Sequence, residues 1–318
     1  MLKSILVFLF FLIVSPSLVA QSCCSGGVPV SSNLGLPASE KGVFQANLAY
    51  DLNVLNTLQD RTERLDDRSR KRSTHSFLLE LGYSWTKKWS TDLFFSFLRQ
   101  ERRIEQNGLQ KDFDKSMGIG DAVVLLKYRA WYRKQGATSL HLGLGSKIPL
   151  GAFDQKDDLG IVLSADLQPG SGAWDFLFWG QGSQQLSFRP SMNLIVTTTF
   201  ALKGENTKFN QTERYAFGDE WLLAMGLSDR ILLGKQIWDA STLLRYRTVA
   251  ADFRNGSKLP STGGEWLFVN PSISWWWRPN VSFNANVEFP IYARLVGTQA
   301  TPTYRINVGM YWRRDKKN

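Results

Sequence analysis

The chain has 318 residues, of which 43% are apolar and 21% charged, and its 38 basic against 28 acidic residues give a formal net charge of +10. This length allows one large barrel or two soluble domains, and two cysteines exclude a long-range disulfide framework. Basic residues are spread over loops and strands, with concentrations in 61–72 and 313–317. Solvated loops and a charged tail therefore explain the charge better than nucleic acid, and no nucleic-acid partner is expected.

Residues 1–20 have the features of a secretory signal peptide. Lys3 supplies a positive start, residues 5–14 are almost entirely apolar, Pro16 interrupts the run, and the small residue Ala20 precedes the expected cleavage site. The run is too short to span a bilayer, and no later stretch of about 18 apolar residues follows. We therefore expect an exported protein without transmembrane helices.

Residues 21–41 follow the signal peptide and are rich in Gly, Ser and Pro, which predicts a periplasmic N-terminal segment or a plug. They contain both cysteines, Cys23 and Cys24. Lipidation of Cys23, a vicinal disulfide, a thiol metal site and a plug contact are all open interpretations, although the preceding residues match a lipobox poorly. A flexible segment without special chemistry is the favoured interpretation, and no metal site is assigned.

From residue 43 onwards, apolar and polar residues alternate in about a dozen segments. The last is the clearest, because Tyr304, Ile306, Val308, Met310 and Trp312 fall on one face of a strand and polar residues on the other. The predicted strands lie near 43–54, 74–85, 89–101, 118–132, 138–149, 174–184, 191–202, 217–227, 236–249, 265–277, 280–290 and 304–313.

Short turns and long polar loops join these segments in strict alternation. Short turns fall at 86–88, 133–137, around Pro190 and at 278–279, and long loops include 102–117, 150–172 and 203–215. Bacterial outer-membrane barrels have short periplasmic turns and long extracellular loops, whereas a soluble β-sandwich has no reason to sort its loops this way. We therefore predict an all-β fold, an antiparallel transmembrane β-barrel of about 12 strands with periplasmic termini, spanning 42–313, followed by a basic tail at 314–318.

The alternation also predicts which side chains face the lumen. A Lys or Arg in hydrocarbon costs about 2 to 4 kcal/mol at the bilayer midplane, so charged residues inside strands are expected to point inward. They either line a water-filled path or cross-link a closed lumen, and a twelve-stranded barrel has an intermediate width that leaves both open. The lumen-lining candidates are Asp121, Lys127, Arg129, His141, Lys147, Asp175, Gln181, Glu220, Asp239, Arg245, Arg247, Asn284, Asn286, Glu288 and Arg305.

Several motifs then resemble one family in order along the chain. They are Gly118-Ile-Gly-Asp-Ala-Val-Val-Leu-Leu-Lys-Tyr-Arg, Gly143-Leu-Gly-Ser-Lys-Ile-Pro-Leu-Gly, Leu167-Gln-Pro-Gly-Ser-Gly-Ala-Trp-Asp, and the ending Phe289-Pro-Ile-Tyr, Gly297-Thr-Gln and Pro302-Thr-Tyr-Arg. They are similar to the outer-membrane transporter family named for the phenol meta-cleavage pathway. The resemblance implies a barrel distantly similar in style to fatty-acid and aromatic-hydrocarbon channels, passing small organic compounds. The paired cysteines and the basic tail depart from that pattern.

Catalysis is the third possibility, because some outer-membrane barrels hydrolyse lipids with Ser and His on one strand. Ser139 and His141 share a face here, but that face is lumenal and near the periplasmic end, far from outer-leaflet lipid. We therefore predict no enzyme and no cofactor. The expected function is passive passage of small, hydrophobic or aromatic molecules across the outer membrane of a Gram-negative bacterium. The alternatives are a structural or adhesive barrel with a closed lumen and, more remotely, a lipid hydrolase.

Membrane lipid, lipopolysaccharide, a small-molecule solute and the barrel-assembly machinery are the expected partners.

Overall fold

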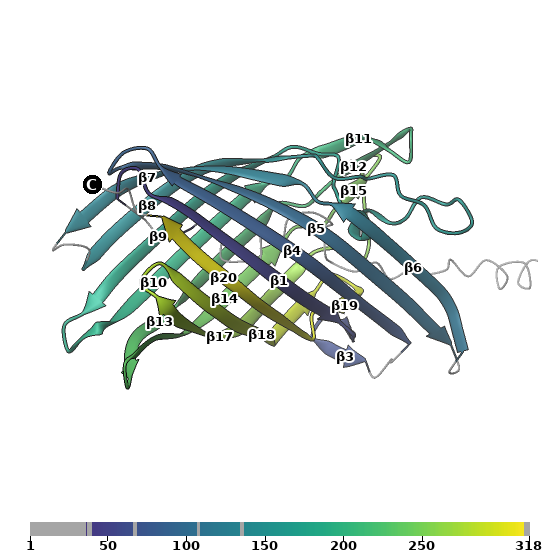
Figure 1. Ribbon diagram of the computed structural model, residues 1–318. Coiled ribbons are helices and arrows are strands. Elements are labelled where there is room, and N and C mark those ends of the chain that lie inside the picture. Colours follow the sequence, from purple (N-terminus) through teal and green to yellow (C-terminus); the bar gives the residue numbers. More distant parts are fainter. Residues whose placement is uncertain (1–35, 37–39, 66–68, 107–108, 134–136, 315–318) are drawn as a thin grey trace, which may run out of the picture.

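Twelve strands form a closed antiparallel barrel in the computed structural model, which describes residues 36, 40–65, 69–106, 109–133 and 137–314 (Figure 1). The first strand pairs with the last, with Leu48 opposite Met310, so the ring has no open edge at its ends. The ring strands in order are β1 (Phe44–Leu55), β4 (Arg70–Ser84), β5 (Trp89–Gln106), β7 (Ala122–Arg133), β8 (Thr138–Ile148), β9 (Asp175–Leu186), β10 (Arg189–Leu202), β13 (Glu220–Leu233), β14 (Gln236–Val249), β17 (Gly264–Arg278), β18 (Val281–Leu295) and β20 (Tyr304–Arg314).

The outward face of the ring is apolar and the inward face carries the polar side chains. Outward Phe77, Leu144 and Phe176 are 57%, 62% and 61% exposed, whereas the inward Asp92 and Lys147 are buried. Apolar side chains exposed in this number around a closed ring require lipid as their solvent. The predicted fold class is confirmed, and the barrel belongs in the outer membrane of a Gram-negative bacterium. Among the described residues, no helix is long and apolar enough to cross a membrane.

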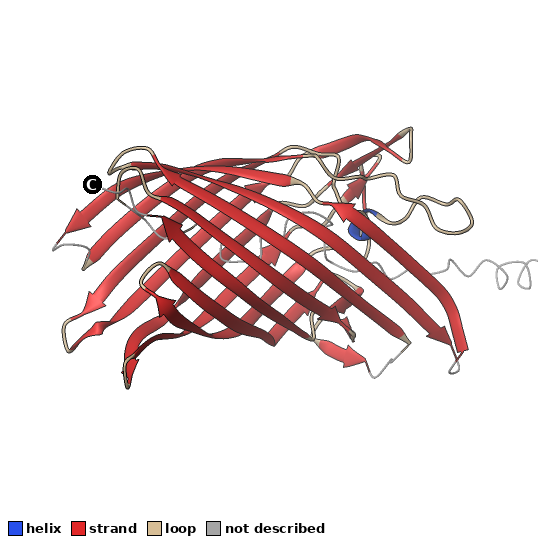
Figure 2. Cartoon of the chain, viewed as in Figure 1, coloured by secondary structure: helices blue, strands red, loops and turns tan. Residues whose placement is uncertain are grey.

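One end of the barrel has short turns and the other has long connections (Figure 2). Two residues suffice between β9 and β10, between β13 and β14, and between β17 and β18. By the rule that outer-membrane barrels keep their long loops outside, the end with the long connections is extracellular.

The long connections contain strands of their own. They are β2 (Thr57–Asp60), β3 (Glu63–Leu65), β11 (Glu205–Phe209), β12 (Glu213–Ala216), β15 (Phe253–Arg254), β16 (Ser257–Lys258) and β19 (Thr298–Thr301). Residues 149–174 are instead an irregular connection with one 3-10 turn at Ala165–Leu167.

The sequence-based prediction of a polar loop at 102–117 is wrong. β5 continues to Gln106 and pairs with an additional strand, β6 (Leu109–Ile119), which runs on into β7 after a break at Gly120. Charged residues can occupy these strands because this part of the sheet extends beyond the lipid belt. β7 pairs with β8, but β6 is the last strand in the order of this sheet. Beside β6, the Gln155 side chain bonds both the N–H and the C=O of Met117.

Candidate functional site: the barrel lumen

The fifteen lumen-lining candidates all lie on the strand face opposite to the lipid-facing residues. Ten side chains are buried: Asp121, Lys127, His141, Lys147, Asp175, Glu220, Arg245, Arg247, Glu288 and Arg305. The remaining five candidates, Arg129, Gln181, Asp239, Asn284 and Asn286, are half-buried. Whether these side chains contact a solute stays a prediction.

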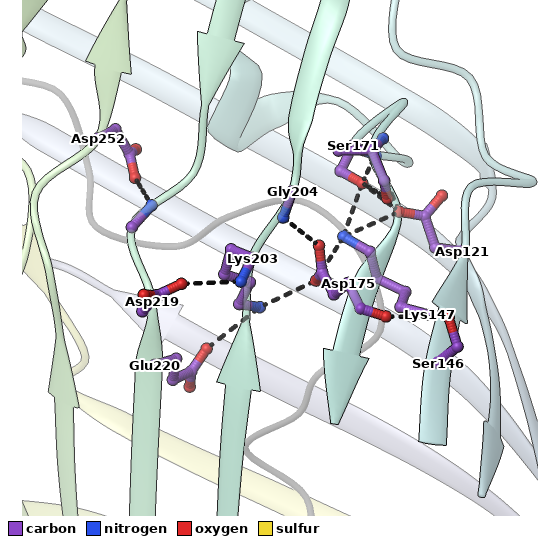
Figure 3. Close-up of polar contacts among 12 residues, drawn as sticks. Asp121, Ser146, Lys147, Ser171, Asp175, Lys203, Gly204, Asp219, Glu220 and Asp252 are labelled. Atoms are coloured by element: carbon purple, nitrogen blue, oxygen red, sulfur yellow. Dashed lines mark hydrogen bonds and ion pairs between the residues drawn. The ribbon is translucent and has the colours of Figure 1, made fainter. Parts of the chain in front are cut away.

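Six of the charged side chains on the inner face form one chain of alternating sign. It crosses six neighbouring strands near their extracellular ends, from Asp121 through Lys147, Asp175, Lys203 and Glu220 to Arg247. Figure 3 shows the part from Asp121 to Glu220. The successive N–O separations are 3.5, 2.8, 3.5, 3.4 and 2.8 Å. Three acids balance three bases, which is how charges removed from water are tolerated. We call this set the ionic chain.

Loop backbone completes the coordination of the ionic chain. The Asp121 carboxylate accepts hydrogen bonds from the N–H groups of Gly151 and Ser171 and from the Ser171 hydroxyl, at 3.1, 3.0 and 2.6 Å. Asp175 accepts one from the Gly204 N–H at 3.0 Å. The connection also lies directly against β6, because a Cβ on Gly151 would stand 2.8 Å from the Ile119 carbonyl oxygen. The ionic chain therefore ties the connection 149–174 to the wall as well as tying the strands together.

A second group of charges follows the ionic chain around the ring, on β14, β18, β20 and β1. Arg305 donates through Nε to both oxygens of Asp51, at 2.9 and 2.8 Å, and Arg245 pairs with Glu288. Beside these pairs is a cavity of about 560 Å³, which is lined on one side by the amides of Asn270, Asn286 and Asn307 and on the other by Phe94 and Leu36. A volume of this size is within the range of small-molecule sites.

The inner face also has an apolar wall that the alternation of residues did not predict. Phe94, Val123, Leu125, Leu177, Trp179 and Ala201 form one buried cluster across β5, β7, β9 and β10. One feature of the sequence does indicate this wall. Residues 122–126 are all apolar, so a strand there places apolar side chains on its inward face as well as on its lipid-facing side. The lumen thus has one polar and one apolar side.

Leu36 lies inside the barrel and is held there by an ion pair. Its N–H donates to Asp92 at 3.0 Å, its carbonyl accepts from Lys127 Nζ at 2.7 Å, and these two side chains are 2.6 Å apart. Its side chain fills the space over Gly82, where a Cβ would stand 2.7 Å from Leu36 Cδ1. Asp92, Lys127 and Gly82 therefore form a socket for one residue of the predicted N-terminal segment. Cys23 and Cys24 lie outside the described residues.

An extracellular cap covers the lumen above the ionic chain. Ala165, Ala173, Phe209, Tyr215 and Phe217 form its apolar core. Arg72 of β4 anchors it from below by pairing with Asp166 at 2.5 Å. Asp252, in the loop after β14, accepts hydrogen bonds from the Gly218 N–H at 2.8 Å and the Tyr215 hydroxyl at 2.7 Å. Burial raises the pKa of Asp252.

The geometry gives no support to the Ser–His alternative. The Ser139 hydroxyl lies 2.7 Å from that of Ser183, and both ring nitrogens of the buried His141 lack a hydrogen-bond partner among the described residues. A nucleophilic serine needs a base within hydrogen-bond reach. Within the same ranges, no group of three or more His, Cys, Asp or Glu residues is arranged to hold a metal ion.

A family model described as "Putative MetA-pathway of phenol degradation" matches residues 103–306. The chain belongs to this family. The resemblance drawn from the motifs is thereby confirmed, and the family's motifs at 118–129 and 167–175 supply Asp121 and Asp175 of the ionic chain. No curated protein matches the chain.

Among solved structures, the COG4313 outer membrane channel from Pseudomonas putida F1 has a TM-score of 0.68 at 12% identity, with 88% of this chain and 97% of that one covered. This likeness shows the shared barrel fold. The transport unit of the autotransporter AIDA-I from Escherichia coli has a TM-score of 0.48 at 9% identity, covering 91% and 94%. The CymD monoaromatic hydrocarbon channel has a TM-score of 0.40 at 10% identity, covering 92% and 98%.

Lys203 is the residue on which the ionic chain depends most, because it bridges Asp175 and Glu220. Lys203→Met leaves two buried carboxylates without that cation, so we expect a loss of about 3 to 5 kcal/mol in the free energy of unfolding. Urea-induced unfolding of the protein in lipid vesicles measures this free energy. The control Lys208→Met changes an exposed lysine of β11 and is expected to stay within about 0.5 kcal/mol. Equal effects of both substitutions would contradict the role of Lys203.

The cap is expected to weaken as the pH rises. Since the pKa of Asp252 is raised in the folded cap, its contribution to stability is complete below the ordinary aspartate value of about 4 and is lost as the pH rises through the folded pKa. Asp252→Asn is expected to remove this dependence. Hydrogen-exchange protection of the Gly218 amide, compared between pH 4 and pH 7, measures it. The same pH dependence in the variant would argue against Asp252 as its source.

Proposed function

We propose that the protein is an outer-membrane channel for the passive passage of small hydrophobic or aromatic molecules. The observation that carries the proposal is the cavity of about 560 Å³ inside the barrel, which has amides and ion pairs on one side and Phe94 with the apolar wall behind it on the other. A hydrophobic molecule gains by leaving water for the apolar wall, and the amides can bond a hydroxyl or carboxylate that it carries. Membership of the phenol-degradation family supports this substrate class.

The N-terminal segment is proposed to act as the plug of this channel. Support comes from Leu36, whose backbone is bound by Asp92 and Lys127 beside the cavity that it helps to line. A backbone clamp of two hydrogen bonds holds one residue in a fixed place without requiring a large interface. The segment can thus block the passage in one state and leave it in another.

The wall beside β6 supports an exit toward lipid. Most of the barrel is sealed by strand pairing, but next to β6 the seal includes hydrogen bonds from the Gln155 side chain to the Met117 backbone and from the Ser116 hydroxyl to the Leu167 carbonyl. Side-chain hydrogen bonds of this kind are easier to break than a ladder of backbone bonds. A hydrophobic solute that leaves through the lower end of this seal would emerge beside the exposed Ile119, which is level with the lipid-facing Phe97, and would enter the membrane without crossing the periplasmic mouth.

The second candidate is a structural or adhesive barrel with a closed lumen, which the ionic chain and the extracellular cap favour. The two candidates differ in permeability. In the first, cells that make the protein take up an apolar aromatic probe such as naphthalene faster than cells that lack it. In the second, both take it up at the same rate.

Filling the cavity is expected to close the channel. Asn286→Trp adds a large side chain at the cavity wall, and we expect uptake of naphthalene to fall to the rate of cells without the protein. The matched control, Leu159→Trp, alters a loop residue that is 84% exposed and should leave uptake unchanged. Removing the clamp on Leu36 with the double substitution Asp92→Asn and Lys127→Met should raise the rate of naphthalene uptake. If cells with and without the unsubstituted protein took up naphthalene at the same rate, the closed-lumen barrel would be the function that remains.

A further inference from the structure

The outward face of β4, β5 and β6 changes from apolar to charged at one level of the sheet. Phe77 and Phe97 are paired across β4 and β5 and face lipid. Moving toward the extracellular end, the next outward positions pair His75 with Arg99, then Ser73 with Glu101, then Lys71 with Arg103. On β6, Lys115 is paired with Glu101. The charged residues therefore begin two residues above the lipid belt, a step of about 7 Å along the strand.

Four of these outward residues are basic and exposed. The side chains of Lys71, Arg99 and Arg103 are 49%, 50% and 52% exposed, and Lys115 is exposed on the neighbouring strand. We call these four residues the basic rim. Two acids accompany them, with Glu101 bonded by Arg99 at 2.5 Å and Glu105 by Lys71 at 2.8 Å. Four cations against two anions leave an excess of two positive charges.

The acids also arrange the basic rim. Glu101 is only 15% exposed in its side chain and lies between Arg99 and Arg103, at 2.5 and 3.6 Å, so both guanidinium groups are drawn to one place on the sheet. Arg103 also lies over the Phe113 ring, 5.3 Å from its centroid, which restricts it further. Fixed guanidinium groups bind phosphate with less loss of side-chain entropy than free ones.

Other strands of the ring have a different outward rim. Trp174 precedes β9 and Trp221 lies on β13, as expected for an aromatic belt at the interface, and on β18 the exposed Arg294 donates to Glu265 at 2.8 Å. Arg294 thus offers a similar cation at the extracellular end of a different strand, without the excess charge of the basic rim.

We propose that the basic rim binds the phosphate groups of lipopolysaccharide in the outer leaflet. The partner is argued from position, because the rim continues directly from the lipid-facing surface and lies where the head groups of the outer leaflet begin. It is argued also from charge, because these head groups are anionic and a basic residue near an anionic membrane surface adds to binding. The acyl chains would lie on Phe77, Phe95 and Phe97 below, and the phosphates at Arg99 and its neighbours above.

The test measures the affinity of the full-length folded protein for bisphosphorylated lipid A in mixed micelles. The double substitution Lys71→Gln and Lys115→Gln leaves both arginine contacts of Glu101 in place, and Arg99→Gln with Arg103→Gln removes them. Each pair is expected to weaken binding about 10-fold or more. The control Arg294→Gln should bind as the unsubstituted protein does. Heat-dependent mobility in gel electrophoresis verifies that each variant is folded.

Two further probes separate the possible ligands. Lipid A without phosphates should bind the unsubstituted protein and the double variants equally, and millimolar inorganic phosphate should not displace lipid A. Equal affinity of the double variants and Arg294→Gln for bisphosphorylated lipid A would overturn the proposal. It would also be overturned if free phosphate competed as well as lipid A, since the rim would then be a general anion site. Neither result depends on whether the lumen conducts a solute.

Discussion

The arrangement of the whole molecule depends on the way charge is paired inside the ring. Lipid on the outside leaves the interior as the only place for charged side chains, and the interior is too narrow to hydrate each of them fully. The ionic chain solves this by alternating sign on six neighbouring strands, so that each internal member contacts a partner on either side. Asp121 also accepts hydrogen bonds from the backbone of Gly151 and Ser171, which fixes the connection 149–174 over the lumen, and Asp175 accepts one from Gly204 in the connection after β10.

The ion pairs occupy only part of the inner face, and the rest of it carries apolar and amide side chains. Between the ionic chain and the Arg305–Asp51 pair, the inner face divides into an apolar wall and an amide-rich wall that faces the cavity. A lumen filled by ion pairs alone would only brace the barrel. The apolar wall is the feature that bracing does not explain, since buried Phe94 and Trp179 contribute no charge to it.

The sequence was enough to predict the barrel because lipid imposes a two-residue period on every strand. The turn positions, the strand number and the inward direction of Asp121, Lys147 and Glu220 all follow from that period. The two-residue period could not place Lys203, because Lys203 lies one residue past the end of β10, where the alternation no longer applies. It also could not predict β6, because the charged residues of β6 resemble those of a loop. The clamp on Leu36 brings together residues 56 and 91 positions apart, and no local pattern indicates such a contact.

The central claim is that the lumen is a passage which the N-terminal segment closes at Leu36. Single-channel conductance in planar bilayers tests it most directly, comparing the full-length chain with a variant lacking residues 21–41. The account predicts discrete openings that become larger or more frequent in the variant, because the clamp between Asp92 and Lys127 then holds no chain. Silence from both proteins, each verified as folded, would contradict it and leave a closed barrel.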